Sequence, residues 1–254
     1  MTVQRYRDGA WGEVNKVGKP LDDVSVDVRR EGEWQEIWPS VDIPDIVENQ
    51  SFAWYPFDEY ADAQTENFED QSPNDNDLDR GRISGMTTIN GVQASDFDGT
   101  DDFLSSDEFS DIFPCTVFVV LDMGGSSDQC VSNLDNDTAK IVGYDIDSDD
   151  DWELNAEKNV SATNSDADAG LLTSVFDDGA SLIRQDGDDI LIDGDVGTRD
   201  ADIINVGARA LEGKSEDSHF EGAIGELIVY DDILDSGKID EVEEYLAGKW
   251  GFTI

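Results

Sequence analysis

The stretch GAIGELIVYDD at residues 222–232 belongs to a series of short apolar runs that decide the fold. From about residue 50 onward, these runs alternate with turns rich in Asp, Gly, Asn and Ser. Short runs spaced in this way, without helices between them, are typical of antiparallel strands in a sandwich or jelly roll. We therefore predict an all-β fold, an antiparallel β-sandwich. Further runs are FAWYPF (52–57), CTVFVVLD (115–122), AKIVGYDI (139–146), GLLTSVFD (170–177) and DIINVGA (202–208).

One short helix is expected to close the chain. Ser236 can cap its first turn, and Gly248 and Gly251 are expected to stop it. Between them the apolar residues recur at the spacing of one helix face. These are Ile239, Val242, Tyr245 and Leu246.

The charge of the chain excludes several classes of partner. Its 254 residues hold 61 acids against 16 bases, a formal net charge of -45. Such a chain repels phosphate backbones and anionic lipid surfaces, so we expect neither nucleic-acid binding nor membrane insertion. No apolar run approaches the roughly 20 residues of a membrane span, and the N-terminus has no apolar signal-peptide segment. Hydrophobic residues still make up 38% of the chain, with 11 Phe, 6 Tyr and 6 Trp, so a folded protein is expected.

We interpret the abundant Asp and scarce Lys as adaptation to molar salt. The Debye length there falls to about 3 Å, which screens self-repulsion, while carboxylates keep the surface hydrated. An acidic protein from ordinary salt with a metal-rich surface is the alternative.

Residues 1–40 differ from the rest of the chain in charge and in pattern. They hold six bases and eight acids, a net of -2, so the remaining 214 residues carry -43. The segment RDGAWGEV (7–14) is repeated as REGEWQEI (30–37), 23 residues later, and each copy predicts a β-hairpin. Two hairpins cannot bury their own apolar face, so we predict an anchor module at 1–40, a linker at 41–49 and a jelly roll at 50–254. The residues expected to form the anchoring interface are Tyr6, Trp11, Trp34 and Trp38. The alternative is a plain pair of N-terminal strands packed on the main domain.

The chain from about residue 50 to its end resembles a concanavalin A-like, laminin-G-type jelly roll. This resemblance implies a displayed module, because such domains occur in virion appendages, adhesins and glycan-binding modules; a jelly roll hosts many activities. The segments that carry it are WY (54–55), DQSPNDNDL (70–78), INGVQ (89–93), FDGTDDFL (97–104), FEGAIGELIVY (220–230) and YLAGKWG (245–251).

Enzymatic activity is not expected from the sequence. Related glucanases carry their two carboxylates in an E-x-D-x-x-E strand, and that pattern is absent from the 254 residues. The chain has a single His, His219, and no Ser/His/Asp or Cys/His constellation for nucleophilic catalysis. We therefore predict no catalytic residues and no required cofactor.

Acidic loops are the candidate sites for Ca²⁺ or Mg²⁺. Alternating carboxylates begin at Asp145, but Asp150 stands where an EF-hand needs Gly and Ala156 where it needs Glu, so an EF-hand is excluded. A looser cation site remains an expectation in either of two loops, and a plain solvated acidic surface is the alternative. The candidate ligands are Asp145, Asp147, Asp149 and Asp151 in one loop, and Asp70, Asn74, Asp75 and Asp77 in the other.

Sugar recognition would need an aromatic platform beside polar groups. Trp152 is the candidate platform, and the alternative is that it packs inward from the strand DWELNA. The polar residues expected beside it are Asp145, Asp147, Arg209 and His219. Cys115 and Cys130 form either a disulfide or two buried thiols.

The expected function is that of a non-enzymatic surface protein of a virus that infects salt-loving archaea. It would sit on the virion as a turret, capsid decoration or tail fibre, after assembly in the host cytoplasm, and attach to a host glycan or glycoprotein. Its expected partners are other virion proteins, through residues 1–40, and copies of itself in a trimer or pentamer. The alternative is a secreted or cell-surface carbohydrate-binding module or glycoside hydrolase of a halophile.

Removing salt tests the halophilic interpretation. Lowering NaCl from molar to millimolar concentration lengthens the Debye length, so repulsion among 61 acids should unfold the chain. Circular dichroism is expected to show loss of the cooperative thermal transition. A chain that keeps its fold and its cooperative melt in dilute buffer contradicts the interpretation.

Overall fold

The computed structural model divides into two compact units, residues 1–42 and residues 43–254, and each is considered by itself. It describes residues 3–7, 10–14, 27–30, 33–36, 42–59, 68–83, 85–124, 129–134, 142–146, 151–162, 170–198, 201–209 and 218–254.

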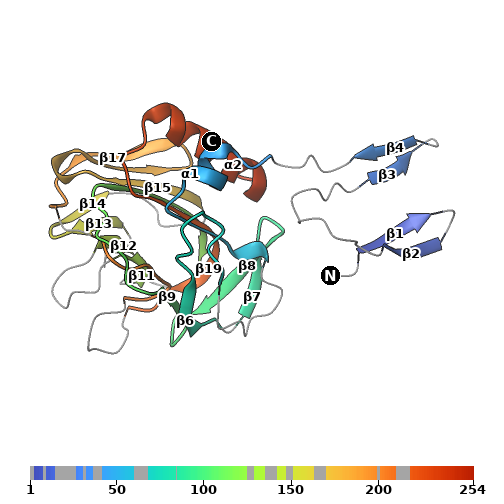
Figure 1. Cartoon of the computed structure of the whole chain (residues 1–254), viewed down its shortest axis with the longest axis horizontal. Coiled ribbons are helices and arrows are strands. Elements are labelled where there is room, and N and C mark those ends of the chain that lie inside the picture. The colour runs from blue at the N-terminus through green and yellow to red at the C-terminus, as the bar shows by residue number, and fades with distance from the viewer. Residues whose placement is uncertain are drawn as a thin grey trace. The chain divides into compact units, whose positions relative to one another are not determined.

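The first unit contains the two expected hairpins (Figure 1). Trp11 lies opposite Tyr6 in the first register, and Trp34 lies opposite Arg29 in the second. Both hairpins are two-stranded sheets, which supports the interpretation of the 23-residue repeat. The anchoring role remains a prediction. The paired strands are β1 (Val3–Arg7) with β2 (Ala10–Val14), and β3 (Asp27–Arg30) with β4 (Glu33–Glu36).

The second unit is an antiparallel β-sandwich, which confirms the predicted fold class. The eight-stranded sheet runs β17 (Asp188–Gly194), β16 (Ser181–Gln185), β15 (Gly170–Phe176), β10 (Cys115–Met123), β19 (Glu221–Tyr230), β8 (Val92–Asp98), β7 (Gly85–Ile89), with β5 (Ala53–Pro56) also paired to β19. The seven-stranded sheet runs β14 (Asn159–Ala162), β13 (Trp152–Ala156), β12 (Val142–Ile146), β11 (Gln129–Asn133), β18 (Asn205–Val206), β9 (Phe103–Ser106), β6 (Leu78–Arg82). Short 3₁₀ helices lie at Phe57–Glu59 (η2) and Asp178–Ala180 (η3).

The central strand β19 is buried on both of its faces. Leu227 and Val229 belong to the core between the sheets, whereas Ile228 and Tyr230 belong to a second cluster on the outer side of the eight-stranded sheet. The neighbouring strand β10 divides in the same way. A strand covered on both faces needs apolar residues at successive positions, which explains why these two runs do not alternate with polar residues.

Two helices provide that outer cover (Figure 1). In α2 (Ser236–Trp250), the predicted apolar face at Ile239, Val242, Tyr245 and Leu246 is buried. The N-cap residue is Asp235, whose carboxylate accepts a hydrogen bond from the backbone N–H of Lys238 at 3.1 Å. The predicted cap, Ser236, is instead the first residue of the helix. The helix also runs through Gly248 and ends at Gly251, which adopts a left-handed conformation with φ 75°.

The other helix, α1 (Asp45–Gln50), lies in the segment expected as a linker. Its Ile46 and Val47 are buried in the cluster beneath the helices, so residues 45–50 belong structurally to the sandwich. No helix among the described residues is long and apolar enough to cross a membrane.

A buried carboxylate, Glu226 of β19, joins the helix layer to the sheet. Glu226 is 0% exposed and accepts hydrogen bonds from Trp54 Nε1 at 2.6 Å and Trp250 Nε1 at 2.8 Å. It also accepts from the Tyr245 hydroxyl at 3.0 Å and lies 2.8 Å from Lys249 Nζ. Burial by itself lowers the pKa of Lys249, but the charges of Glu226 and Asp58 outweigh it and raise that pKa above its usual value. Lys249 therefore stays charged and balances the buried carboxylate.

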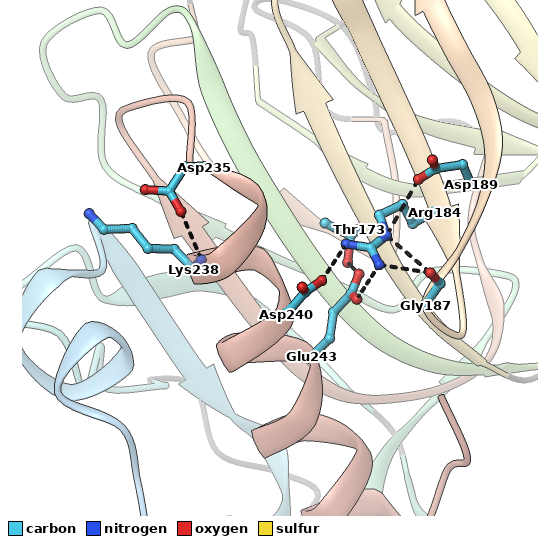
Figure 2. A network of polar contacts seen from close by, with 8 residues as sticks. All are labelled: Thr173, Arg184, Gly187, Asp189, Asp235, Lys238, Asp240 and Glu243. Carbon is cyan, nitrogen blue, oxygen red and sulfur yellow. Dashed lines mark hydrogen bonds and ion pairs between the residues drawn. The ribbon is translucent and has the colours of Figure 1, made fainter.

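A second polar network fixes the other flank of α2 (Figure 2). Arg184 of β16 lies 3.0 Å from Asp240 and 3.3 Å from Glu243 of the helix, and 3.5 Å from Asp189 of β17. The Thr173 hydroxyl donates to Glu243 at 2.6 Å. Burial raises the pKa of Glu243, although Thr173 and Arg184 act in the opposite direction. The helix is thus bound directly to β15 and β16, and Arg184 also links it to Asp189 of β17.

Glu226→Gln tests the importance of the buried carboxylate. The substitution leaves the Lys249 charge buried with Asp58 as its remaining described anionic partner, and removing one member of a buried ion pair costs about 3–5 kcal/mol. We expect urea unfolding in molar NaCl to show a loss of that size. Glu244→Gln on the exposed side of α2 is the matched control, and it should change stability by less than about 0.5 kcal/mol. Equal effects of the two substitutions would contradict the assigned role.

Candidate functional site

The outer face of β13 and β14 carries a group of polar side chains, here called the polar cluster. Along β13, Trp152, Leu154 and Ala156 point into the core, so the alternate residues face outward. The register then places outward residues of β13 opposite those of β14. The members of the polar cluster are Glu153, Asn155, Asn159 and Ser161.

Hydrogen bonds connect these four side chains. Asn159 Nδ2 donates to Glu153 Oε1, and Asn155 Nδ2 donates to Asn159 Oδ1. The Ser161 hydroxyl donates to Glu153 Oε2 at 3.4 Å. Asn159 is exposed, Glu153 and Ser161 are half-buried, and Asn155 is 8% exposed. The cluster therefore holds a carboxylate, two carboxamides and a hydroxyl in one hydrogen-bonded arrangement, in which Asn155 is buried and Asn159 is exposed.

The turn between β13 and β14 is held by the segment that follows β17. The backbone N–H groups of Ala156 and Lys158 both donate to the Val196 carbonyl, at 3.1 and 2.9 Å. Lys158 Nζ lies 2.6 and 2.7 Å from the two carboxylate oxygens of Asp195. Gly197 has φ 90°, and a Cβ there would lie 2.4 Å from the Ala156 carbonyl oxygen, so a glycine is required. These contacts position the strands that carry the polar cluster.

The structure does not bring the predicted sugar-binding residues together in one site. Trp152 is 0% exposed in the core, so the prediction of an aromatic platform was wrong and the inward-packing alternative holds. Asp145 lies on β12 at the register position opposite Glu153, next to the polar cluster. Arg209 Nη2 donates to Ser218 Oγ at 2.9 Å, and His219 Nδ1 lies 3.4 Å from the Asp102 carbonyl oxygen.

The expected metal loop lies mostly outside the described residues. Asp147 and Asp149 are not among them, and neither is Trp38 of the expected anchor. Asp151 is described and half-buried directly before β13.

The other expected metal loop is held by hydrogen bonds to the chain itself. The Asp70 carboxylate accepts from the backbone N–H groups of Trp54 and Ser72, both at 2.8 Å, and of Asn76 at 2.9 Å. Asn74 Nδ2 donates to the Phe52 carbonyl at 3.0 Å. Asp70 and Asn74 therefore bind the chain itself and hold the loop against β5, and the cation site remains a prediction.

Sequence reasoning missed a third acidic group, in the turn between β8 and β9. Carboxylate oxygens of Asp98, Asp101 and Asp102 lie within 4.8 Å of one another. Burial favours a higher pKa for Asp98, but backbone N–H groups of Thr100 and Asp101 hold that pKa below its usual value. Asp101 also pairs with Arg82. These carboxylates serve first to order the turn, and the D-G-T-D-D sequence is the signal that marks it.

A groove of about 590 Å³ lies beside the start of α2, on the helix side of the sandwich. Its lining includes Val175, Leu182 and Ile233, with Asp177 and Asp188 among the acidic residues. Among the described residues that line it there is no aromatic side chain, and the base Arg184 is already engaged with α2. The groove therefore lacks the platform on which a sugar ring would stack.

Cys115 and Cys130 are two buried thiols, one on each sheet, and they do not form a disulfide. This decides between the two alternatives left open by the sequence. Burial raises the pKa of Cys115 to about 12, so its thiol stays protonated and unreactive.

Comparison with known proteins supports the fold. No family model and no curated protein sequence matches the chain. Among solved structures, domain 4 of AbnA, a GH43 extracellular arabinanase from Geobacillus stearothermophilus, in complex with arabinotriose, is 15% identical with a TM-score of 0.56. The match covers 76% of this chain and 98% of that domain. Trypanosoma rangeli sialidase in complex with sialic acid is 12% identical with a TM-score of 0.55, over 89% of this chain and 36% of the sialidase. The chain thus spans about a third of the sialidase's length.

These neighbours overturn the expectation that the chain is not an enzyme, because they come from an arabinanase and a sialidase. The expectation rested on the missing E-x-D-x-x-E strand. Glycosidases as a class need two suitably spaced carboxylates, which different strands or loops can supply. The missing motif therefore excludes only the case in which both carboxylates lie on a single E-x-D-x-x-E strand. At 15% identity or less, the comparisons establish for this chain a β-sandwich of the kind found in carbohydrate-active proteins.

Proposed function

We propose that the sandwich is a glycan-binding module, displayed on the particle of a virus of salt-loving archaea and used for attachment to the host. The observation that carries the proposal is the polar cluster on the outer face of β13 and β14. Sugar hydroxyls both donate and accept hydrogen bonds, and a carboxylate beside carboxamides satisfies both functions. The AbnA domain matched over 98% of its length was solved with arabinotriose, which adds support from a protein of similar fold.

The described helices do not cover the face that carries the polar cluster. Helices α1 and α2 cover the outer side of the eight-stranded sheet, whereas the polar cluster lies on the outer side of the seven-stranded sheet. Asn159 is exposed there, and the cluster is held by its own hydrogen bonds before any ligand arrives. A preorganised site loses less conformational entropy on binding.

Attachment to a particle is proposed for residues 1–42. Their two hairpins are separate two-stranded sheets, which are marginally stable in isolation and gain stability from a partner surface. The near-neutral charge of residues 1–40 suits a contact surface better than the -43 carried by the rest.

A second candidate is a secreted carbohydrate-active enzyme of a halophile, or its binding module. It is favoured by the origin of the structural neighbours in an arabinanase and a sialidase. Sustained release of reducing sugar from host glycoprotein by the purified chain would favour this candidate over attachment alone.

Substitutions in the polar cluster test glycan binding. Glu153→Gln removes a charged acceptor and should weaken binding about 10- to 100-fold, and Asn159→Ala removes a neutral partner and should weaken it about 3- to 10-fold. The measurement is binding to host-surface glycans and arabino-oligosaccharides in molar NaCl. Asn49→Ala, on α1 and exposed, is the matched control and should bind like the wild type. Binding that is unchanged in both cluster variants would place the ligand elsewhere.

Antibodies against the sandwich test display on a particle. In purified virus they are expected to label the particle surface and to block its adsorption to host cells, because the proposed binding face points outward. Antibodies against an internal capsid protein serve as the control. Detection of the protein solely in particle-free medium or in the soluble cell fraction would contradict the virion proposal.

A further inference from the structure

We infer that the polar cluster selects neutral glycans and rejects sugars that carry a carboxylate or a sulfate. This inference rests on the proposed glycan-binding function. It concerns the charge of the ligand, which neither the fold nor the comparisons determine.

The charges at the face are negative. Glu153 contributes a carboxylate to the cluster, where it accepts hydrogen bonds from Asn159 and Ser161. Asp151 precedes β13, and the exposed Glu157 stands in the turn after it. An anionic sugar hydrogen-bonded to the exposed amide of Asn159 would place its charge beside these carboxylates, and like charges in contact oppose binding.

Several bases among the described residues, including the one nearest to the cluster in sequence, already bind carboxylates. Proteins bind carboxylates and sulfates through Arg or Lys, whose N–H groups match the anionic oxygens. Lys158 is the base nearest to the cluster in sequence, and both oxygens of Asp195 hold its ammonium. Arg82 pairs with Asp101, and Arg184 and Lys249 bind carboxylates in the helix layer. The amides and hydroxyl that remain suit the hydroxyl groups of neutral sugars.

Molar salt does not remove this selectivity. Screening at a Debye length of about 3 Å suppresses the long-range field of the chain. It weakens the repulsion between two charges in direct contact much less, because their separation does not greatly exceed that length. The preference should therefore persist where the general effect of the -45 net charge has been screened.

The test uses matched glycans that differ in one acidic group. The full chain in molar NaCl is applied to an array that holds neutral and acidic members of each pair, including methyl galactoside with methyl galacturonide and lactose with lactose that carries one sulfate. Neutral members are expected to bind at least about tenfold more tightly than their acidic partners. The Glu153→Gln variant should weaken neutral binding and lower this ratio to about threefold, whereas Asn159→Ala should weaken binding and leave the ratio unchanged.

The possible results distinguish a failure of the neutral selectivity from a failure of the glycan-binding function. Equal or tighter binding of acidic members, with or without added Ca²⁺, overturns the neutral selectivity and leaves the glycan-binding function standing. Absence of binding to every glycan overturns both. Selectivity that survives Glu153→Gln unchanged overturns the assignment of the discrimination to this carboxylate.

Discussion

A carboxylate removed from water must find partners, and Glu226 meets this constraint between the eight-stranded sheet and the helices that cover it. Its position on β19 places it between β5 and α2, so its hydrogen-bond donors come from a strand on one side and a helix on the other. Two indole N–H groups, a phenol and an ammonium surround it. Satisfying one charge thus fixes where β5 lies along the sheet and how the helix crosses it.

The helix layer decides which surface the protein can use for recognition. Because α1 and α2 cover the eight-stranded sheet, β10 and β19 have apolar residues on both faces and no room for a ligand. The seven-stranded sheet has no such cover from the described helices, and its strands β13 and β14 alternate between core residues and polar ones. The buried carboxylate Glu226 holds the helices on one sheet, and the polar cluster lies on the sheet that these helices do not cover.

Much of the fold could be predicted from local patterns. The apolar runs and their turn residues indicated the sandwich, the spacing of Ile239 and Val242 indicated α2, and the repeated Trp segments indicated two hairpins. Helix α1 was missed because six residues after Pro44 give too short a pattern. The prediction that Trp152 lies at the surface was wrong. The apolar residues Leu154 and Ala156 alternate with polar residues on the same strand, and this pattern indicates that Trp152 faces the core with them. The polar cluster needed more than parity, because it depends on the register between β13 and β14, which the sequence does not display.

The contact between the turn after β13 and the Val196 carbonyl affects the way copies of the protein can associate. Strands β14 and β17 are the edges of the two sheets on the same side of the sandwich, and free edges can recruit strands from other molecules into fibres. Here the Val196 carbonyl, after β17, accepts hydrogen bonds from the N–H groups of Ala156 and Lys158, which precede β14. Exposed carboxylates such as Asp188 and Asp193 lie along β17. These contacts and charges therefore oppose edge-to-edge aggregation on this side of the sandwich.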